Sequence, residues 1–175
     1  MELMNSNYLY FGGYEMNIKK ADLFFTASEG SIITEGIQFF QRGGESCPYT
    51  HVAIIDEWPW IISADPEGVV RREIQKEELY KFTVLTCPTL TDKQRDDIIE
   101  SAMKDVERGV KYDFYSIGAL ATHLPIEIDE DKFYCSEHAY TKFLKKGCAL
   151  LRRKPNWITP RDLFHSAMLE EVPTN

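Results

Sequence analysis

The sequence predicts a single domain of the α+β class, because strand-like segments follow one another in its first half and helix-like segments dominate its second half. The chain has 175 residues, of which 43% are hydrophobic, so it can enclose a sizeable core. We expect residues 1–20 to be an N-terminal extension and residues 21–175 to form the domain, with an antiparallel sheet packed against helices.

The predicted sheet consists of short apolar runs. Residues 21–27 contain the run Leu-Phe-Phe, which is typical of a buried strand. Two β-rich segments at 51–55 and 60–63 are separated by turn residues and predict a hairpin. Residues 68–74 and 82–85 extend the series. We therefore expect these strands to form a meandering antiparallel sheet.

Helix signals are clearest between Thr91 and Gly109. Thr91 and Gln94 form a capping box, the apolar residues that follow have helical spacing, and Gly109 is a stop signal. Further helices are expected at residues 31–42 with a stop at Gly43-Gly44, from 115 to 124, from 135 to 146, and from a start at Thr159-Pro160 to Leu169.

The composition restricts the classes of partner. A formal net charge of −8 argues against duplex DNA or an anionic membrane surface, which attract clustered Lys and Arg. The basic clusters Arg71-Arg72 and Arg152-Arg153-Lys154 are interpreted as solvated surface. No stretch approaches the ~20 apolar residues that span a bilayer, and the N-terminus lacks a signal-peptide pattern. We therefore expect a cytoplasmic protein with no nucleic-acid partner and no stable membrane insertion.

One of the four cysteines occupies a position suited to nucleophilic chemistry. Cys135 lies at the predicted start of a helix, where unpaired N–H groups and the helix dipole favour a thiolate and can bind an oxyanion. Cys47, Cys87 and Cys148 lie next to a proline or a stop glycine and are interpreted as packing or surface residues. On position alone, Cys135 is equally well explained as a small buried residue.

A base for Cys135 must come from four histidines. His51 opens an apolar strand, where a titratable ring is unexpected for packing alone, so it is the preferred base. His138 lies on the same predicted helix as Cys135, and His123 and His165 lie near helix ends. These three are interpreted as structural residues.

A third residue is expected to hold the second ring nitrogen of the histidine. If the hairpin turn is centred near Glu57, His51 lies across from Ser63, and Asp65 falls on the same face two residues further on. Glu67 is a third candidate, although its position indicates a turn. Each of the three can supply the orienting acceptor.

Six short motifs follow one another in a particular order along the chain. They are Ala21-Asp-Leu-Phe-Phe, Tyr49-Thr-His-Val-Ala-Ile54, Ser63-Ala-Asp-Pro-Glu-Gly-Val69, Tyr112-Asp-Phe, Phe133-Tyr-Cys-Ser-Glu137 and Thr159-Pro-Arg-Asp-Leu163. This order resembles the permuted NlpC/P60 proteins of the YiiX/YaeF type, over roughly residues 21–163. In that family the histidine strand precedes the cysteine helix, so the resemblance implies a circularly permuted papain-like fold.

The resemblance also implies residue roles. Cys135 in Tyr-Cys-Ser-Glu corresponds to the nucleophile, and His51 in Thr-His-Val-Ala corresponds to the general base. The family has a glutamate where this chain has Ser63, so either Ser63 is a neutral acceptor, or Asp65 or Glu67 substitutes, or activity is weakened. Three further candidates for oxyanion or substrate binding are Tyr49, Tyr134 and Ser136.

The implied activity is hydrolysis of amide bonds in small peptides with cell-wall-type amino acids, through an acyl-enzyme and without a cofactor. The architecture also resembles lecithin:retinol acyltransferase-like enzymes, so an acyl substrate such as a lipid ester or thioester is an alternative. Trp58, Trp60 and Phe39-Phe40 would then contribute to an apolar groove. A catalytically silent binding module is a further alternative, because Ser63 replaces the expected acid.

Zinc binding is the weakest interpretation. Cys47, His51, Cys135 and His138 offer two thiols and two imidazoles, which Zn²⁺ accepts, but paired CxxC knuckles are absent and no metal is expected. Glu137 is interpreted as a first-turn charge that stabilises its helix rather than as a catalytic group.

Overall fold

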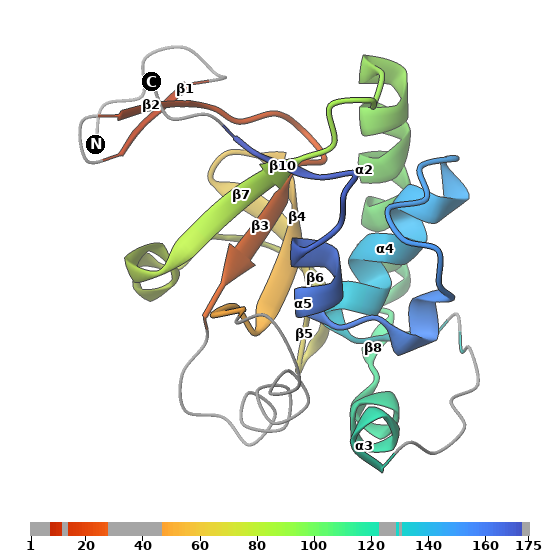
Figure 1. The fold of residues 1–175 in the computed structure, drawn as a ribbon. Helices are drawn as coiled ribbons and strands as arrows, with labels where there is room; N and C mark the ends of the chain where they lie inside the picture. The colour runs from red at the N-terminus through yellow and green to blue at the C-terminus, as the bar shows by residue number, and fades with distance from the viewer. Residues whose placement is uncertain (1–7, 12–13, 28–46, 123–128, 130, 173–175) are drawn as a thin grey trace.

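The computed structural model describes residues 8–11, 14–27, 47–122, 129 and 131–172. These residues form the predicted α+β architecture, in which one face of a six-stranded sheet is covered by helices (Figure 1). The covering helices are α2 (Asp92–Arg108), α4 (Cys135–Lys145) and α5 (Pro160–Phe164).

The sheet is antiparallel throughout. In spatial order its strands are β10 (Glu170–Glu171), β7 (Phe82–Thr86), β3 (Leu23–Thr26), β4 (His51–Glu57), β5 (Trp60–Asp65) and β6 (Gly68–Glu73). The strands from β3 to β6 form the predicted meander, but β7 pairs with β3 instead of continuing beside β6. The short 3₁₀ helix η1 (Lys76–Tyr80) lies between β6 and β7. As a result β3 is hydrogen-bonded along both edges, to β4 on one side and to β7 on the other.

The central strands are buried on both faces because their apolar runs do not alternate with polar residues. Phe25 and Ile54 belong to the cluster that packs under the helices. Phe24, Ile55 and Ile61 belong to a second cluster on the other face. The sheet is therefore the middle layer of the core, and the polar ends of its strands are left to form a site.

The register of the β4–β5 hairpin differs from the prediction. Ile54 pairs with Ile62, and continuing this ladder places His51 level with Asp65. The expectation that His51 lies directly across from Ser63 is wrong by two residues, because the turn is centred at Trp58-Pro59 instead of Glu57, with a bulge beside it. A shift of two keeps all three side chains on one face of the sheet.

Helix α2 confirms the capping-box prediction. The Thr91 hydroxyl accepts the backbone N–H of Gln94 at 3.2 Å, and the Gln94 side chain accepts the backbone N–H of Thr91 at 3.1 Å. The helix ends at Gly109, whose φ of 64° is the left-handed conformation expected of a glycine stop.

The last predicted helix is shorter than expected. α5 begins at the predicted Thr159 cap but ends at Phe164 instead of Leu169. The hydroxyl of Ser166 donates to the backbone oxygen of Leu150 at 2.6 Å, which fixes the chain in a turn before β10. A buried side-chain contact thus ends a helix that its local sequence would have continued.

The remaining elements connect the two layers. The helix predicted after residue 114 is present, whereas the predicted helix at 31–42 and most of the loop at 125–132 lie outside the described residues. The elements that connect the layers are α3 (Phe114–Thr122), η2 (Pro155–Trp157) and the parallel pair of strands β8 (Lys111–Tyr112) and β9 (Lys132–Phe133).

Residues before the sheet form a separate ribbon of β1 (Tyr8–Phe11) and β2 (Tyr14–Asn17). Ile18 follows this ribbon and is buried in the second apolar cluster. The division into an extension of residues 1–20 and a domain of residues 21–175 stays a prediction. Among the described helices, none combines the length and apolar character needed to cross a bilayer.

Candidate active site

The thiol of Cys135 is placed at the first residue of α4. Tyr134 is the N-cap, with extended backbone angles, and the first helical hydrogen bond runs from His138 N–H to its oxygen at 2.9 Å. The N–H groups of Cys135, Ser136 and Glu137 therefore precede the intrahelical bonding pattern. They give the start of α4 a positive potential beside the sulfur, as the sequence predicts.

His51 brings its ring to this helix end from the first position of β4. Helix α4 packs against β4 and β5, and the Cys135 side chain lies near enough to the His51 ring to raise the pKa of His51. The other contact of the ring is from Nε2 to the Ser63 hydroxyl oxygen, at 2.7 Å. Because Nε2 is engaged by Ser63, Nδ1 is the nitrogen left to face the sulfur.

Ser63 and Asp65 act on His51 together rather than as alternatives. The Ser63 hydroxyl donates its single hydrogen to Asp65 Oδ1 at 2.5 Å. Toward His51 it therefore acts as an acceptor, and the hydrogen of that bond is carried by Nε2 of the ring. Asp65 Oδ1 itself lies 3.5 Å from Nε2 of His51. A neutral acceptor thus contacts the imidazole while a carboxylate stands directly behind it.

The charges of these groups shift their pKa values in a consistent way. Burial by itself lowers the pKa of His51, but the Cys135 sulfur and the Asp65 carboxylate outweigh it and raise the pKa overall. Burial by itself raises the pKa of Asp65, but His51, Arg72 and Ser63 lower it overall. The geometry therefore favours an imidazolium beside the sulfur and an ionised carboxylate behind it.

Arg72 completes the carboxylate end of the site, and the sequence interpretation missed it. Its Nε donates to Asp65 Oδ2 at 2.6 Å, and its guanidinium forms two bonds to Glu78, of 2.7 and 3.0 Å. The interpretation of Arg71-Arg72 as solvated surface is wrong for Arg72. Arg72 lies four residues after Gly68 and so on the same face of β6, and Gly68 pairs with Asp65. This even spacing was the signal that could have placed Arg72 on the face of Asp65.

Tyr112 also lies at the site. It is buried, and its ring is 4.9 Å from that of Phe114, in an edge-on arrangement. Burial and the charges of Cys135 and Asp65 raise the pKa of its hydroxyl, which keeps the phenol neutral. Tyr112 pairs with Phe133, so the short β8–β9 ladder holds it beside the start of α4.

Other candidate residues are placed differently. Glu67 is exposed in the turn between β5 and β6, and the structure does not bring it to His51. The Tyr134 hydroxyl accepts the Ile158 N–H at 3.3 Å, and the Ser136 hydroxyl donates to the Ile158 oxygen at 2.6 Å. These two side chains therefore attach α4 to the segment before α5.

Tyr49 lies under the same segment. Its ring packs against Phe25 and Phe164, with centroid distances of 6.2 and 5.2 Å. The binding roles assigned to Tyr49, Tyr134 and Ser136 stay predictions. What the geometry gives to all three is a part in holding the cysteine helix and the histidine strand together.

The four proposed zinc ligands do not form one cluster. His138 is buried, with Nε2 3.3 Å from Asp105 Oδ2 of α2 and its ring 5.6 Å from that of Phe133. Lys142 contacts the same Asp105 oxygen. In the described part of the chain, no three His, Cys, Asp or Glu side chains are arranged to hold a metal ion.

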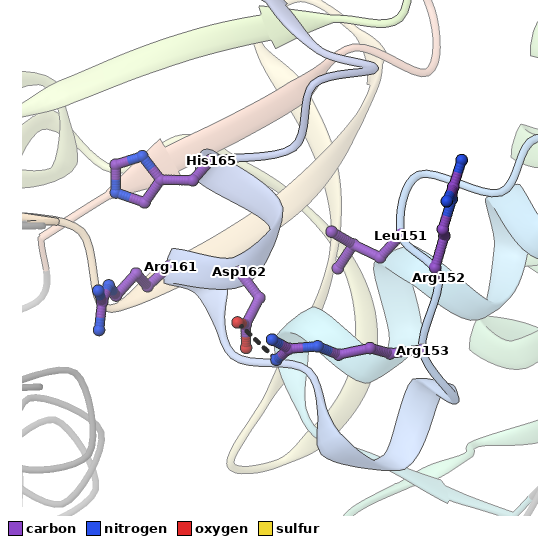
Figure 2. A pocket seen from close by; sticks show the side chains of 6 residues that line it. All are labelled: Leu151, Arg152, Arg153, Arg161, Asp162 and His165. Carbon is purple, nitrogen blue, oxygen red and sulfur yellow. Dashed lines mark hydrogen bonds and ion pairs between the residues drawn. The ribbon is translucent and has the colours of Figure 1, made fainter. Parts of the chain in front are cut away.

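A pocket of about 520 Å³ lies away from these residues, between α5 and the segment that follows α4 (Figure 2). Arg153 is engaged with Asp162 at 3.0 Å, and the labelled arginine side chains point in different directions instead of converging. The pocket contains none of the residues predicted to be catalytic. Its lining consists of Leu151, Arg152, Arg153, Arg161, Asp162 and His165.

Comparison with known proteins supports the architecture. No family model and no curated protein matches the sequence. Among solved structures, the chain is similar to the metalloprotein YiiX from Escherichia coli O157:H7, with 16% sequence identity and a TM-score of 0.67; the match covers 90% of this chain and 97% of YiiX. A likeness at this level of identity establishes the fold. The chain thus has the α+β fold of YiiX, the type that the order of its motifs predicted.

Proposed function

We propose that the protein is a cysteine hydrolase that cleaves amide bonds of small peptides through an acyl-enzyme on Cys135. The observation that supports this most strongly is the position of the His51 ring, which lies near Cys135 and whose Nε2 contacts the Ser63 hydroxyl. A nucleophile, a base and an orienting acceptor that follow one another in space form the arrangement that covalent acyl transfer requires.

The first step is attack on the substrate carbonyl. The proton of Cys135 passes to His51, and the thiolate forms a bond with the carbonyl carbon. The negative charge that develops on the carbonyl oxygen faces the unpaired N–H groups at the start of α4, which stabilise it without reorganising. His51 then gives its proton to the departing amine, which leaves Cys135 acylated.

The second step releases the acid. His51 accepts a proton from a water molecule, the resulting hydroxide attacks the acyl carbon, and the thiolate departs. In both steps the Ser63 hydroxyl keeps the imidazole in one orientation, and the carboxylate of Asp65 stabilises its positive form. Arg72 holds that carboxylate in place.

The proposed chemistry uses no metal. YiiX is described as a metalloprotein, but among the described residues of this chain no three His, Cys, Asp or Glu side chains are arranged to hold a metal ion. His138 is engaged by Asp105, and the second nitrogen of His51 by Ser63. The proposed mechanism therefore has no step on a metal ion. The proposed substrates are small peptides with cell-wall-type amino acids.

The test is turnover of short N-acyl peptides carrying a chromogenic amide leaving group. Cys135→Ala is expected to abolish release of the chromophore, and His51→Ala to lower kcat/KM by a factor of about 10³ or more. Ser63→Ala is expected to have a smaller effect, because Asp65 remains nearby. His165→Ala is the matched histidine control, and its activity should equal that of the unchanged protein.

Alkylation separates an enzyme from a silent binding module. Iodoacetamide at neutral pH should modify Cys135 faster in the unchanged protein than in His51→Ala, because the imidazole promotes the thiolate. Mass spectrometry of the Cys135 peptide gives the rate. Equal rates in the two proteins, together with full turnover by Cys135→Ala, would refute the proposed mechanism.

A second candidate function is acyl transfer or hydrolysis of a lipid ester or thioester, and α3 favours it. Phe114 and Tyr115 are 55% and 70% exposed at the start of this apolar helix. Because Phe114 packs edge-on against Tyr112, whose hydroxyl experiences the charge of Cys135, the exposed aromatics lie on the Tyr112 side of the proposed site. An apolar surface in that place fits an acyl chain better than a polar peptide.

The aromatics first expected to form an apolar groove are placed elsewhere. Trp58 packs against Phe24 and Phe82, and Trp60 lies under the Arg71 guanidinium, 4.4 Å from the ring centroid. Phe39-Phe40 lie outside the described residues. The double variant Phe114→Ser/Tyr115→Ser discriminates the two functions: it should lower kcat/KM for a p-nitrophenyl acyl ester of long chain, while leaving a short peptide amide unaffected.

A further inference from the structure

A second pair of cysteines meets inside the protein, separate from the proposed catalytic centre. Cys87 follows β7 and Cys148 follows α4, and their sulfur atoms are 3.4 Å apart although the residues are 61 positions apart in sequence. Both are free thiols, with exposed fractions of 0% for Cys87 and 6% for Cys148. Neither takes part in the hydrolase mechanism proposed above.

The surroundings of the two sulfurs differ. The Cys87 sulfur is 3.3 Å from the Thr89 hydroxyl, and the guanidinium of Arg95 is close by, donating to the Cys87 backbone oxygen at 3.1 Å. The hydrogen bond with Cys148, assisted by Thr89 and Arg95, lowers the pKa of Cys87 to about 6 despite burial. The same contact and burial raise the pKa of Cys148. At neutral pH the pair therefore shares one proton, as a thiolate beside a thiol.

We propose that Cys87 and Cys148 are a redox modification site, at which a hydroperoxide converts the two thiols into a reversible intramolecular disulfide. A bonded S–S distance is about 2.05 Å, so the sulfurs must approach by about 1.4 Å from their present separation. Cys148 lies in the loop after Gly147, outside any helix or strand, so this approach moves no regular element.

The chemistry balances with the hydroperoxide as oxidant. The Cys87 thiolate attacks the terminal peroxide oxygen, an S–O bond forms, the O–O bond breaks, and the second oxygen leaves with a proton as water or alcohol. The Cys148 thiol then attacks the sulfenic sulfur, the S–S bond forms, and the S–O bond breaks with release of water. Two thiols are oxidised, and one hydroperoxide is reduced.

The crosslink would join the end of β7 to the C-terminal end of α4, the helix that carries Cys135 at its other end. It closes a long loop that includes the whole of α2, so it restricts the unfolded chain more than the folded one. Oxidation should therefore stabilise the contact between the sheet and the helical layer without adding any residue to the proposed active site.

The test is peptide mapping of the full-length protein. The reduced protein is treated with hydrogen peroxide at neutral pH, its remaining thiols are blocked with N-ethylmaleimide, and it is digested without reductant. We expect a peptide pair linked through Cys87 and Cys148 that separates on addition of dithiothreitol. The urea midpoint of the oxidised protein should shift upwards, and dithiothreitol should return it to the starting value.

Single variants identify the partners. Cys87→Ser and Cys148→Ser should lose the linked peptide completely, and Cys148→Ser should retain a Cys87 sulfenic acid that reacts with dimedone. Cys47→Ser is the control cysteine and should form the crosslink as the unchanged protein does. If the native protein yields no linked pair, or if the link forms only in denaturant, the proposal is wrong even where Cys135 proves catalytic.

Discussion

At the scale of single residues, Asp65 is one of the charges that raise the pKa of His51, after Cys135. The carboxylate lies behind Ser63 and contributes to the raised pKa of the imidazole. Asp65→Asn keeps the shape of the residue and removes the charge. The pKa of His51 should fall, and the alkaline limb of the pH profile of kcat/KM should move to lower pH, because His51 loses its proton earlier.

The same change can be followed without a substrate. The chemical shift of the His51 ring against pH, measured by NMR, should give a lower midpoint in Asp65→Asn. Glu67→Gln removes an exposed carboxylate from the same hairpin and should leave both the midpoint and the alkaline limb where they are. An unchanged midpoint in Asp65→Asn would show that Asp65 exerts no electrostatic effect on the imidazole.

Glu137 is a second residue whose ionisation has a measurable consequence. It is 2% exposed, and burial, together with the charge of Asp113, raises its pKa from 4.5 to about 8. The folded protein therefore holds a proton that the unfolded chain releases, and folding stability falls as pH rises through this window. The first-turn carboxyl is thus neutral at pH 7, contrary to the interpretation of Glu137 as a stabilising helix charge.

Glu137→Gln should abolish this pH dependence, because glutamine is neutral throughout. The variant should match the unchanged protein at about pH 5 and exceed its free energy of unfolding by on the order of 4 kcal/mol at about pH 9. Urea titrations at the two pH values provide the measurement, and Glu107→Gln, at an exposed position of α2, is the control. Equal alkaline stability of all three proteins would contradict the burial argument.

At the scale of elements, Gly68 permits the close approach of β6 to the segment after α2. Its φ is 124°, which L side chains rarely adopt, and a Cβ there would lie 2.6 Å from the Val110 backbone oxygen. The same oxygen accepts the Val69 N–H at 2.8 Å. The glycine therefore allows the hydrogen bond that attaches the β5–β6 hairpin, and with it Asp65, to the helical layer.

Gly68→Ala should lower the free energy of unfolding by about 2–4 kcal/mol, since it combines backbone strain with a steric overlap. Gly118→Ala tests the reverse case in α3, where the added methyl group meets nothing within 4 Å. That variant should be neutral or slightly more stable. Thermal unfolding of the two variants gives the comparison, and a Gly68→Ala protein as stable as Gly118→Ala would exclude the proposed clash.

At the scale of the whole molecule, one buried ion pair joins the sheet layer to the helical layer. Arg95 of α2 donates to Asp22 at 2.7 Å, and the two side chains are 7% and 1% exposed. Arg95 also bonds the backbone oxygens of Lys20 and Cys87. The guanidinium therefore connects the start of β3, the end of β7 and α2 at a single point.

Asp22→Asn should lower the free energy of unfolding by about 3–5 kcal/mol, because it leaves the buried guanidinium without its counter-charge. Asp96→Asn is the matched change on the surface, where the aspartate is 65% exposed and pairs with Lys20 at 3.2 Å. It should change stability by less than about 1 kcal/mol. Urea denaturation measures both variants. If Asp22→Asn and Asp96→Asn lost similar free energies of unfolding, the buried ion pair would contribute no more than the exposed one, contrary to this prediction.

The local signals were sufficient for much of the fold. The capping box at Thr91 and the stop at Gly109 located α2, because both are interactions between residues close in sequence. The start of α4 at Cys135 was also predicted, although its N-cap, Tyr134, makes no side-chain capping bond. By contrast, the end of α5 depends on a buried contact of Ser166 with Leu150, which no local pattern contains.

What the sequence by itself determined is the main sheet strands and helices and the fold type, and it proposed Cys135 and His51 for the site, since propensities, caps and motif order are read along the chain. Only the tertiary structure decided that Ser63 contacts His51 while Asp65 binds Ser63 from behind, that Arg72 bonds the Asp65 carboxylate, and that β7 pairs with β3. The physical reason is that strand register and long-range side-chain contacts depend on how the whole core packs.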